Sequence, residues 1–210
     1  VHFLSDWRIT RESIGDGVLV ARAYGSDVDP PPGVSPPVEL TEARRSLLRC
    51  ASTVVVPSQR FRRTVANFAG IDDARMNVIL GGVDTSLFAP RSRRRADTSL
   101  VVGYVKGFEP VYGPMTFVEA IPRVLARCPN VRFDLLGTGS RLQACRRRAA
   151  ELNVDHAIRW LAPVPHEKMP TVMSDWDVVA ISSLKESFCV AAIEASAMEI
   201  PVVATDVGGL

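Results

Sequence analysis

From residue 100 to the end of the chain, short runs of apolar, β-branched residues alternate with longer segments whose apolar residues recur at helical spacing. The first pattern indicates buried strands, and the second indicates amphipathic helices. Strands that alternate with helices form parallel sheets with right-handed crossovers, so this region is predicted to be a doubly wound α/β domain. The predicted strands are residues 100–106, 131–137, 157–161, 177–181 and 201–205, and the predicted helices are residues 115–127, 140–153, 167–174 and 190–198.

The earlier residues show the same alternation less regularly. Residues 29–37 carry five prolines and are not expected to form regular structure. A glycine, Gly70, is expected to stop the second helix of this region. The predicted strands are residues 1–4, 17–23, 53–56 and 76–80, and the predicted helices are residues 40–49 and 59–69.

These patterns predict an α/β chain with two Rossmann-like doubly wound domains. Residues 1–90 are expected to be part of a first domain, and the polar, basic residues 91–99 are expected to form a linker. Residues 100–210 are expected to form a second domain that is incomplete at its C-terminus. We therefore expect the chain, which begins with Val1, to be a fragment of a longer protein.

Composition and charge exclude several classes of protein. The chain is 47% hydrophobic and 23% charged, which is typical of globular α/β proteins, and its net charge of +2 favours no charged partner. No apolar run reaches the roughly 18 residues that would span a membrane. The cysteines have neither zinc-site nor C-x-x-C spacing, so reduced thiols in a cytoplasmic protein are expected. These cysteines are Cys50, Cys128, Cys145 and Cys189.

Two basic runs, residues 91–95 and 146–148, raise the question of nucleic-acid binding. Few aromatic residues are interleaved with them, so nucleic acid is not an expected partner. The second run lies on a predicted helix whose opposite side is apolar. It is therefore interpreted as a solvated face, or as a peripheral contact with the anionic headgroups of the inner membrane face.

Two glutamates, Glu186 and Glu194, lie eight residues apart around a predicted helix start. The polar residues 182–187 follow a predicted strand, at the edge where open α/β sheets bind ligands. Ser187 is predicted to cap a helix over residues 188–198, whose first-turn N–H groups and dipole can hold a diphosphate. Glu194 is expected about two turns into that helix. The two acids could therefore contact different parts of one extended ligand, such as a sugar nucleotide.

The region from Glu186 to Gly209 resembles the E-x7-E region of retaining glycosyltransferases of family four (glycosyl transferases group 1), which have the GT-B fold. Three further segments resemble motifs of that family in the family's order. They are AYGSD at residues 23–27 (the "HGSD" loop), RMNVI…GVD…FAP at residues 75–90 (the interdomain "NGVD…F-P" segment) and the strand at residues 131–137 with Gly139 ("LLGxG").

The resemblance implies transfer of a sugar from a nucleoside-diphosphate donor to an unidentified sugar or lipid-linked acceptor, with retention of configuration. It implies no metal and no cofactor, in agreement with histidines that lie outside any ligand spacing. Lys106 and Glu186 are the implied catalytic residues: Lys106 would stabilise the departing diphosphate, and Glu186 would bind the donor sugar. Glu194 would bind the ribose. The other implied donor-site residues are Gly137, Gly139, Ser187, Phe188 and Cys189, and those on the acceptor side are Tyr24 and Gly25.

Several residues depart from the family pattern. Gly107, and Val111 or Tyr112, stand where the family has a phosphate-binding arginine and lysine. Cys189 and Glu199 replace glycines, and Tyr24 replaces a histidine that contacts the transferred sugar.

These departures leave a degenerate, non-catalytic GT-B domain as one alternative, and a nucleotide-sugar epimerase on the same fold as another. A dinucleotide-binding domain is set aside, because the G-x-G-x-x-G turn is missing after the strand at residues 100–106.

Overall fold

A computed structural model describes residues 2–3, 17–30, 35–92 and 99–210. They belong to two compact units. Unit 1 comprises Val1–Gly81, Lys185–Phe188 and Gly208–Leu210, and unit 2 comprises Gly82–Leu184 and Cys189–Val207. The strand predicted at residues 1–4, the proline-rich stretch at 29–37 and the linker predicted at 91–99 lie partly outside the described residues.

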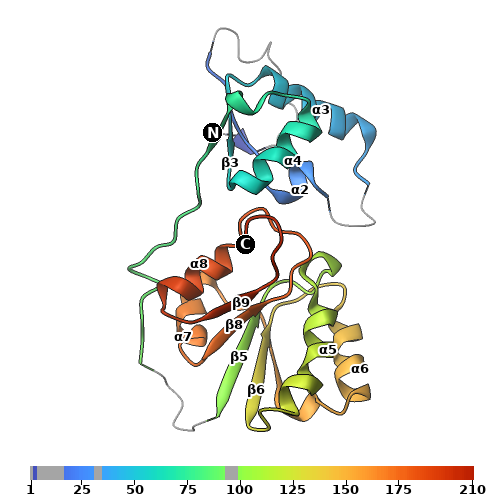
Figure 1. Ribbon diagram of the computed structural model, residues 1–210, viewed down its shortest axis with the longest axis vertical. Helices are drawn as coiled ribbons and strands as arrows, with labels where there is room; N and C mark the ends of the chain where they lie inside the picture. Colours follow the sequence, from blue (N-terminus) through green and yellow to red (C-terminus); the bar gives the residue numbers. More distant parts are fainter. Residues whose placement is uncertain (1, 4–16, 31–34, 93–98) are drawn as a thin grey trace. The chain divides into compact units, whose positions relative to one another are not determined.

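In its described residues, unit 1 contains a parallel sheet of four strands ordered β1-β2-β3-β4, as they occur in the chain. Helices follow the strands in the α/β manner (Figure 1). The strands are β1 (His2–Phe3), β2 (Val20–Arg22), β3 (Thr53–Val56) and β4 (Met76–Val78). The helices are α2 (Gly25–Val28), α3 (Val38–Cys50) and α4 (Gln59–Ala69), with a 3-10 turn η1 (Asp73–Arg75) before β4.

The bounds of helix α4 are determined by residues at its two ends. The hydroxyl of Ser58 accepts a hydrogen bond from the backbone N–H of Phe61 and so caps the helix start. Gly70 ends the helix in the left-handed region, at φ 65°, which glycine adopts without steric cost. The apolar face of α4 buries Phe61 and Val65 in the core of unit 1.

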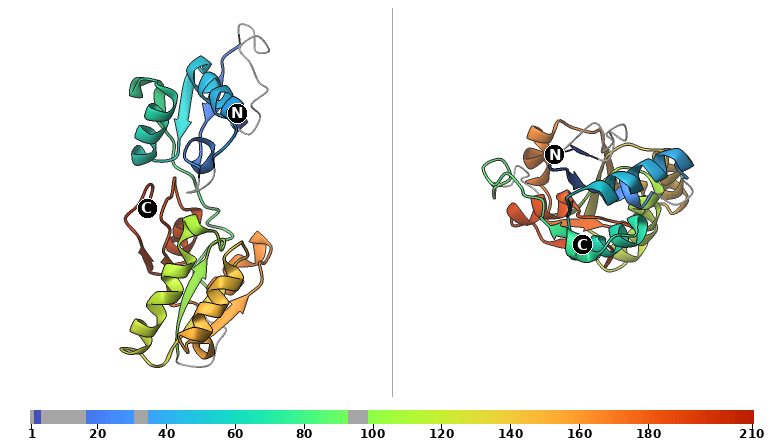
Figure 2. Two further views of the ribbon diagram at one scale, coloured as in Figure 1. Left: turned by 90° about the vertical axis from the view of Figure 1, so that its right-hand side faces the viewer. Right: turned by 90° about the horizontal axis from the view of Figure 1, so that it is seen from above.

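Unit 2 contains a five-stranded parallel sheet of order β7-β6-β5-β8-β9. Helices α5 and α6 cover one face of this sheet, and α7 and α8 cover the other (Figure 1). Figure 2 also shows α5 and α6 side by side. The strands are β5 (Leu100–Val105), β6 (Val131–Leu136), β7 (Ile158–Leu161), β8 (Val178–Ile181) and β9 (Val202–Ala204). The helices are α5 (Pro114–Leu125), α6 (Leu142–Glu151), α7 (Met169–Met173) and α8 (Val190–Ala197).

The core of unit 2 beneath α5 and α6 is rich in aromatic side chains. The rings of Tyr104 and Phe117 are 5.1 Å apart, and Phe117 meets Phe133 edge to face at 6.1 Å. Tyr104 and Phe108 are fully buried. Such tilted and edge-to-face pairs are favourable for aromatic rings, so the centre of the sheet is a firm support for the loops at its edge.

A buried carboxylate joins strands β6 and β7 to the segment before β8. Asp134 on β6 is 2% exposed and accepts hydrogen bonds from the guanidinium of Arg159 on β7. It also accepts a hydrogen bond of 2.9 Å from the indole nitrogen of Trp176. The hydrogen bonds to Asp134 raise the pKa of Arg159. Asp134 is therefore paired with hydrogen-bond donors within unit 2, as a buried charge requires.

The predicted α/β class with parallel sheets is confirmed. Strand β3 and helix α4 have the predicted bounds, and the other elements differ from the predictions at their ends. The helix predicted at residues 167–174 begins as a 3-10 turn, η4 (His166–Lys168), before α7.

Candidate functional site

The carboxyl ends of β5 and β8 form the point in unit 2 where the chain changes direction across the sheet. From β5 the chain continues toward β6 and β7, and it returns to β8 on the other side of β5. In open α/β sheets, ligands bind outside the carboxyl ends of the strands at such a switch point. The loops after β5, β6 and β8 and the start of α8 therefore define the candidate site.

Lys106 begins the loop after β5, because the strand ends at Val105, one residue earlier than predicted. Its Nζ atom lies 4.9 Å from the centre of the Tyr112 ring, within the range of a cation–π interaction. The hydroxyl of the buried Tyr104 lies within hydrogen-bonding distance of the carbonyl oxygens of Gly107 and Tyr112. The loop is thus held to the strand beneath it, and Lys106 is its single cation between residues 106 and 113.

The loop after β6 lies directly against the loop after β5. The backbone N–H of Phe108 donates to the carbonyl of Thr138 at 2.8 Å, and the N–H of Arg141 donates to the carbonyl of Phe108 at 2.8 Å. Gly137 and Gly139 have φ values of 152° and 154°, which side chains of L-residues rarely adopt. The structure therefore brings Lys106, Gly137 and Gly139 together, and both glycines permit the close approach of the two loops.

A carboxylate fixes the second of these loops. Glu109 accepts hydrogen bonds from the Ser140 hydroxyl at 2.5 Å and from the Ser140 backbone N–H at 2.8 Å. These hydrogen bonds, the hydroxyl first, hold the pKa of Glu109 below its ordinary value. Glu109 was not singled out from the sequence, because its partner lies in a different loop.

The loop after β8 is also tied to the loop after β5. The hydroxyl of Ser182 donates to the carbonyl of Gly113 at 2.8 Å, and the N–H of Leu184 donates to the carbonyl of Val111 at 2.8 Å. The hydroxyl of Thr205, after β9, donates to the carbonyl of Ser183 at 2.5 Å. Neighbouring loops along the carboxyl edge of the sheet are therefore connected by hydrogen bonds.

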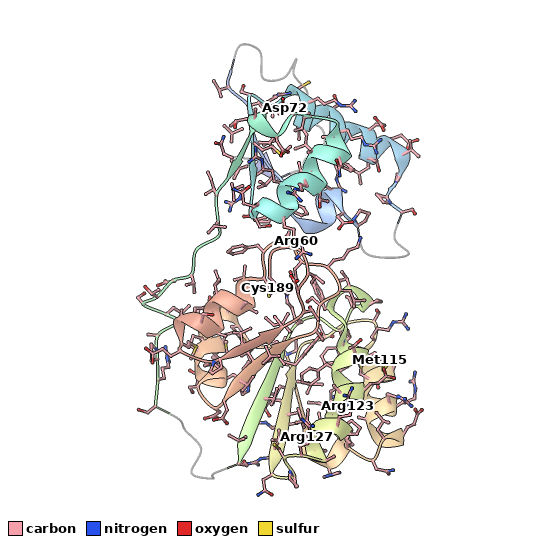
Figure 3. The ribbon with its side chains drawn as sticks, viewed as in Figure 1. Arg60, Asp72, Met115, Arg123, Arg127 and Cys189 are labelled. Atoms are coloured by element: carbon pink, nitrogen blue, oxygen red, sulfur yellow. The ribbon has the colours of Figure 1, made fainter. Side chains whose placement is uncertain are left out.

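The prediction that Ser187 caps helix α8 is wrong. The helix begins at Val190, and its N-cap is Cys189 (Figure 3). Cys189 is 5% exposed and has φ 43°, in the left-handed region. The backbone turns sharply at Cys189, and this turn sets the helix start more strongly than the capping preference of a serine two residues earlier.

The predicted site residues are divided between the two units. Glu186, Ser187 and Phe188 fall in unit 1, which also contains Tyr24 and Gly25. In unit 1 the guanidinium of Arg22 lies 4.8 Å from the centre of the Tyr24 ring, and Gly25 begins α2. Lys106, Gly137, Gly139, Cys189 and Glu194 fall in unit 2.

Glu194 is a buried carboxylate in the second turn of α8. It is 7% exposed, and its Oε1 atom lies 2.7 Å from Nε2 of His166. Among the described residues, His166 is the one that hydrogen-bonds this side chain. The ring of His166 lies in turn 5.1 Å from the fully buried ring of Phe88.

Sequence reasoning missed His166, because the histidines were tested only for metal-ligand spacing. One signal could have identified it: Pro165 and His166 come shortly after β7, at the same carboxyl edge of the sheet as the other loops. In the part of the chain that the structure describes, no group of three or more His, Cys, Asp or Glu residues is arranged to hold a metal ion.

The run Arg146–Arg148 has partners within unit 2. Arg148 pairs with Glu119 and Glu151 at 3.1 Å each, and the guanidinium of Arg146 lies 5.4 Å from the centre of the Trp160 ring. Contact of this run with a membrane therefore stays a prediction from the sequence. Within the described residues, no helix has the length and apolar character needed to cross a membrane.

Comparison with known proteins places the chain in a family. The model of the family "Glycosyl transferases group 1" matches residues 88–210. A D-inositol 3-phosphate glycosyltransferase of Corynebacterium efficiens is 32% identical over 211 residues, covering 91% of this chain and 48% of that protein.

Solved structures agree with this assignment. Sucrose-phosphate synthase from Thermosynechococcus elongatus superposes with a TM-score of 0.77 at 25% identity, covering 92% of this chain and 51% of that one. Anabaena HepE, solved in complex with UDP-glucose, gives a TM-score of 0.75 at 23% identity, covering 92% and 54%. The chain spans about half the length of the relatives it matches. The family model and these likenesses confirm the resemblance read from the motifs: the chain belongs to the glycosyl transferases group 1 family, family four, and has part of the GT-B fold.

Proposed function

We propose that this chain carries the donor-binding part of a retaining glycosyltransferase that uses a UDP-sugar. The observation that carries the proposal is Glu194: a buried carboxylate on the helix that follows the switch point of a GT-B domain. A carboxylate in that position can accept hydrogen bonds from the two ribose hydroxyls of a nucleotide. The choice of UDP is supported by HepE, which was solved with UDP-glucose.

The diphosphate would lie between Lys106 and the start of α8. Lys106 supplies a positive point charge, and the start of α8 supplies the positive end of the helix dipole. Both would act on the negative charge that develops as the bond between sugar and diphosphate breaks. The sugar is then transferred to an acceptor oxygen with retention of configuration, and no metal is needed to neutralise the leaving group.

Glu186, in unit 1, is proposed to bind the hydroxyls of the donor sugar, with Ser187 and Phe188 beside it in the chain. The loop with Gly137 and Gly139 packs closely against Lys106. Because these glycines have no side chains, we propose that the backbone of this loop lies next to the nucleotide. Tyr24 and Gly25 are proposed to lie on the acceptor side. The acceptor is proposed to be a sugar or a lipid-linked sugar.

Calorimetric titration of the 210-residue chain with UDP, GDP and ADP, without metal, tests the donor site. We expect UDP to bind and Glu194→Ala to weaken its binding by about 1–3 kcal/mol, or about 5- to 150-fold. Glu167→Ala is the matched control, because Glu167 is exposed and lies beside His166 in sequence. No binding of any of the three nucleotides by the folded chain would contradict the proposal.

A second candidate function is binding without transfer. It is favoured by the loop after β5, where Gly107 stands in place of a phosphate-binding arginine and Lys106 is the single cation. A chain that binds UDP-glucose but does not release UDP with any acceptor, even as part of the longer protein, would support this degenerate form. Conversion of the bound sugar to an epimer, detected by chromatography of the nucleotide sugars, would instead support an epimerase.

A further inference from the structure

We propose that His166 is a positioning residue for Glu194: it orients this carboxylate so that the ribose hydroxyls meet a fixed acceptor. The inference rests on the proposed donor site and adds a residue to it. His166 does not contact the nucleotide in this proposal. It acts through Glu194 alone.

A direct hydrogen bond joins His166 to Glu194. Nε2 of His166 and Oε1 of Glu194 are 2.7 Å apart, although the two residues are 28 positions apart in sequence. A carboxylate can only accept hydrogen bonds, so Nε2 carries the hydrogen and donates it. The Glu194 side chain is 9% exposed and the His166 side chain is 60% exposed, so a buried group is held by a partner that reaches in from the surface.

The other carboxylate oxygen of Glu194 has acceptor capacity for a ligand. No described residue donates a hydrogen bond to Oε2 of Glu194. A carboxylate has about four lone-pair positions, so the bond from His166 fixes the plane of the group and leaves acceptor capacity for a ligand. A long side chain that is already ordered loses less conformational entropy when a ligand binds. The histidine therefore prepares Glu194 for the ribose.

His166 is held by the buried ring of Phe88. Its ring lies 5.1 Å from the ring of Phe88, at an angle of 48°, and Phe88 is fully buried. The N–H of Phe88 donates to the carbonyl of Asp84 at 2.8 Å. The carboxylate of Asp84 accepts hydrogen bonds from the hydroxyl of Ser86 at 2.6 Å and from its N–H at 2.9 Å.

These hydrogen bonds close a turn that ends at Phe88. The segment from Asp84 to Phe88 belongs to the motif that resembles "NGVD…F-P". The inference therefore assigns a specific role to that motif, because its phenylalanine supports the histidine that orients Glu194. The hydrogen bonds from Ser86, the hydroxyl first, hold the pKa of Asp84 below its ordinary value. The Asp84 carboxylate is therefore charged at neutral pH, and it accepts the hydrogen bonds that hold the turn.

The experiment compares two ligands on matched variants of the 210-residue chain. The ligands are the nucleoside diphosphate that binds in the first titration and its 2′,3′-dideoxy analogue, which lacks both ribose hydroxyls. The variants are His166→Ala, which removes the ring, and His166→Phe, which keeps a ring against Phe88 but removes the donor. His166→Gln restores a donor, and Glu167→Ala is the surface control.

We expect His166→Ala and His166→Phe each to weaken binding of the ribonucleotide by about 3- to 10-fold, the usual effect of one lost hydrogen bond. Binding of the dideoxy analogue should not change, because it makes no use of Glu194. His166→Gln should recover most of the affinity, and Glu167→Ala should behave as wild type. Thermal melting of each variant checks that it is folded.

Three outcomes would overturn the inference. Equal losses for both ligands would mean that His166 supports the structure in general. An unchanged ribonucleotide affinity in His166→Phe, with a loss in Glu194→Ala, would leave the donor site intact and remove His166 from it. Absence of any nucleotide binding by the wild-type chain would overturn the proposed function, and this inference with it.

Discussion

A side chain at Gly137 would collide with the backbone carbonyl of Lys106. The loops after β5 and β6 run so close together here that no Cβ atom fits, and the φ of Gly137 is 152°. The position of Lys106 at the candidate site therefore requires a residue without a Cβ atom at position 137.

We expect Gly137→Ala to lower the free energy of unfolding by at least about 2 kcal/mol, from backbone strain and overpacking together. Gly82→Ala is the control, because a Cβ atom there meets nothing within 4 Å. It should change the stability by no more than about 1 kcal/mol. Urea unfolding of both variants measures the difference. Equal stabilities would mean that the loops can separate without loss.

Glu199→Gly is expected to stabilise the chain by about 1 kcal/mol. Glu199 is exposed and follows α8 with φ 59°, a conformation in which glycine avoids the steric cost that other residues incur. Glu199→Ala separates the two contributions, since alanine removes the side chain but keeps the Cβ atom. Urea unfolding should show a gain for glycine alone, and an equal gain for alanine would attribute the effect to charge.

Asp134→Asn is expected to destabilise unit 2 by about 1–3 kcal/mol. Asparagine has one accepting oxygen, and its NH2 group donates, so either Arg159 or the indole of Trp176 loses its hydrogen-bond partner. Glu151→Gln breaks an exposed ion pair with Arg148 and should change stability by less than about 1 kcal/mol. Urea unfolding followed by tryptophan fluorescence compares the two, and similar values for both would contradict the structural account.

Two of the four thiols are expected to react quickly with a thiol reagent, and the other two are expected to be protected. Cys50 and Cys128 are exposed, whereas Cys145 and Cys189 are buried. Burial also raises the pKa of Cys145, so at pH 8 it has less of the reactive thiolate than an exposed cysteine.

Titration of the native chain with a chromogenic disulfide reagent should therefore show two fast equivalents, and two more after urea is added. Cys50→Ser and Cys128→Ser should each remove one fast equivalent. Fast reaction of a third thiol in the native chain would show that one of the buried sites opens readily.

The bounds of a helix were predicted correctly where residues at its two ends determine them. Ser58 and Gly70 supply the start and stop of α4, and both signals are local. The cap of α8 was wrongly predicted for the opposite reason: it depends on a left-handed backbone at Cys189, and a cysteine gives no indication of that conformation.

The candidate site was predictable as far as it depends on motifs. Lys106, Gly137 and Gly139 were named from those motifs as donor-site residues, and the structure places them in two adjacent loops, whereas their roles stay predictions. The pair of His166 and Glu194 was not foreseen, because the two residues meet only when α8 packs near the loop after β7. Pair contacts of that kind depend on the fold as a whole, and no spacing in the sequence reports them.

Helix α8 is flanked by two left-handed residues that are not glycine, Cys189 before it and Glu199 after it. In the genetic code, both are a single base from glycine: cysteine codons differ from glycine codons at the first base, and glutamate codons at the second. A library of random point mutants therefore samples both glycine variants. Selection for heat resistance should enrich Glu199→Gly, and enrichment of Cys189→Gly beside it would show that the helix carrying Glu194 is strained at both ends.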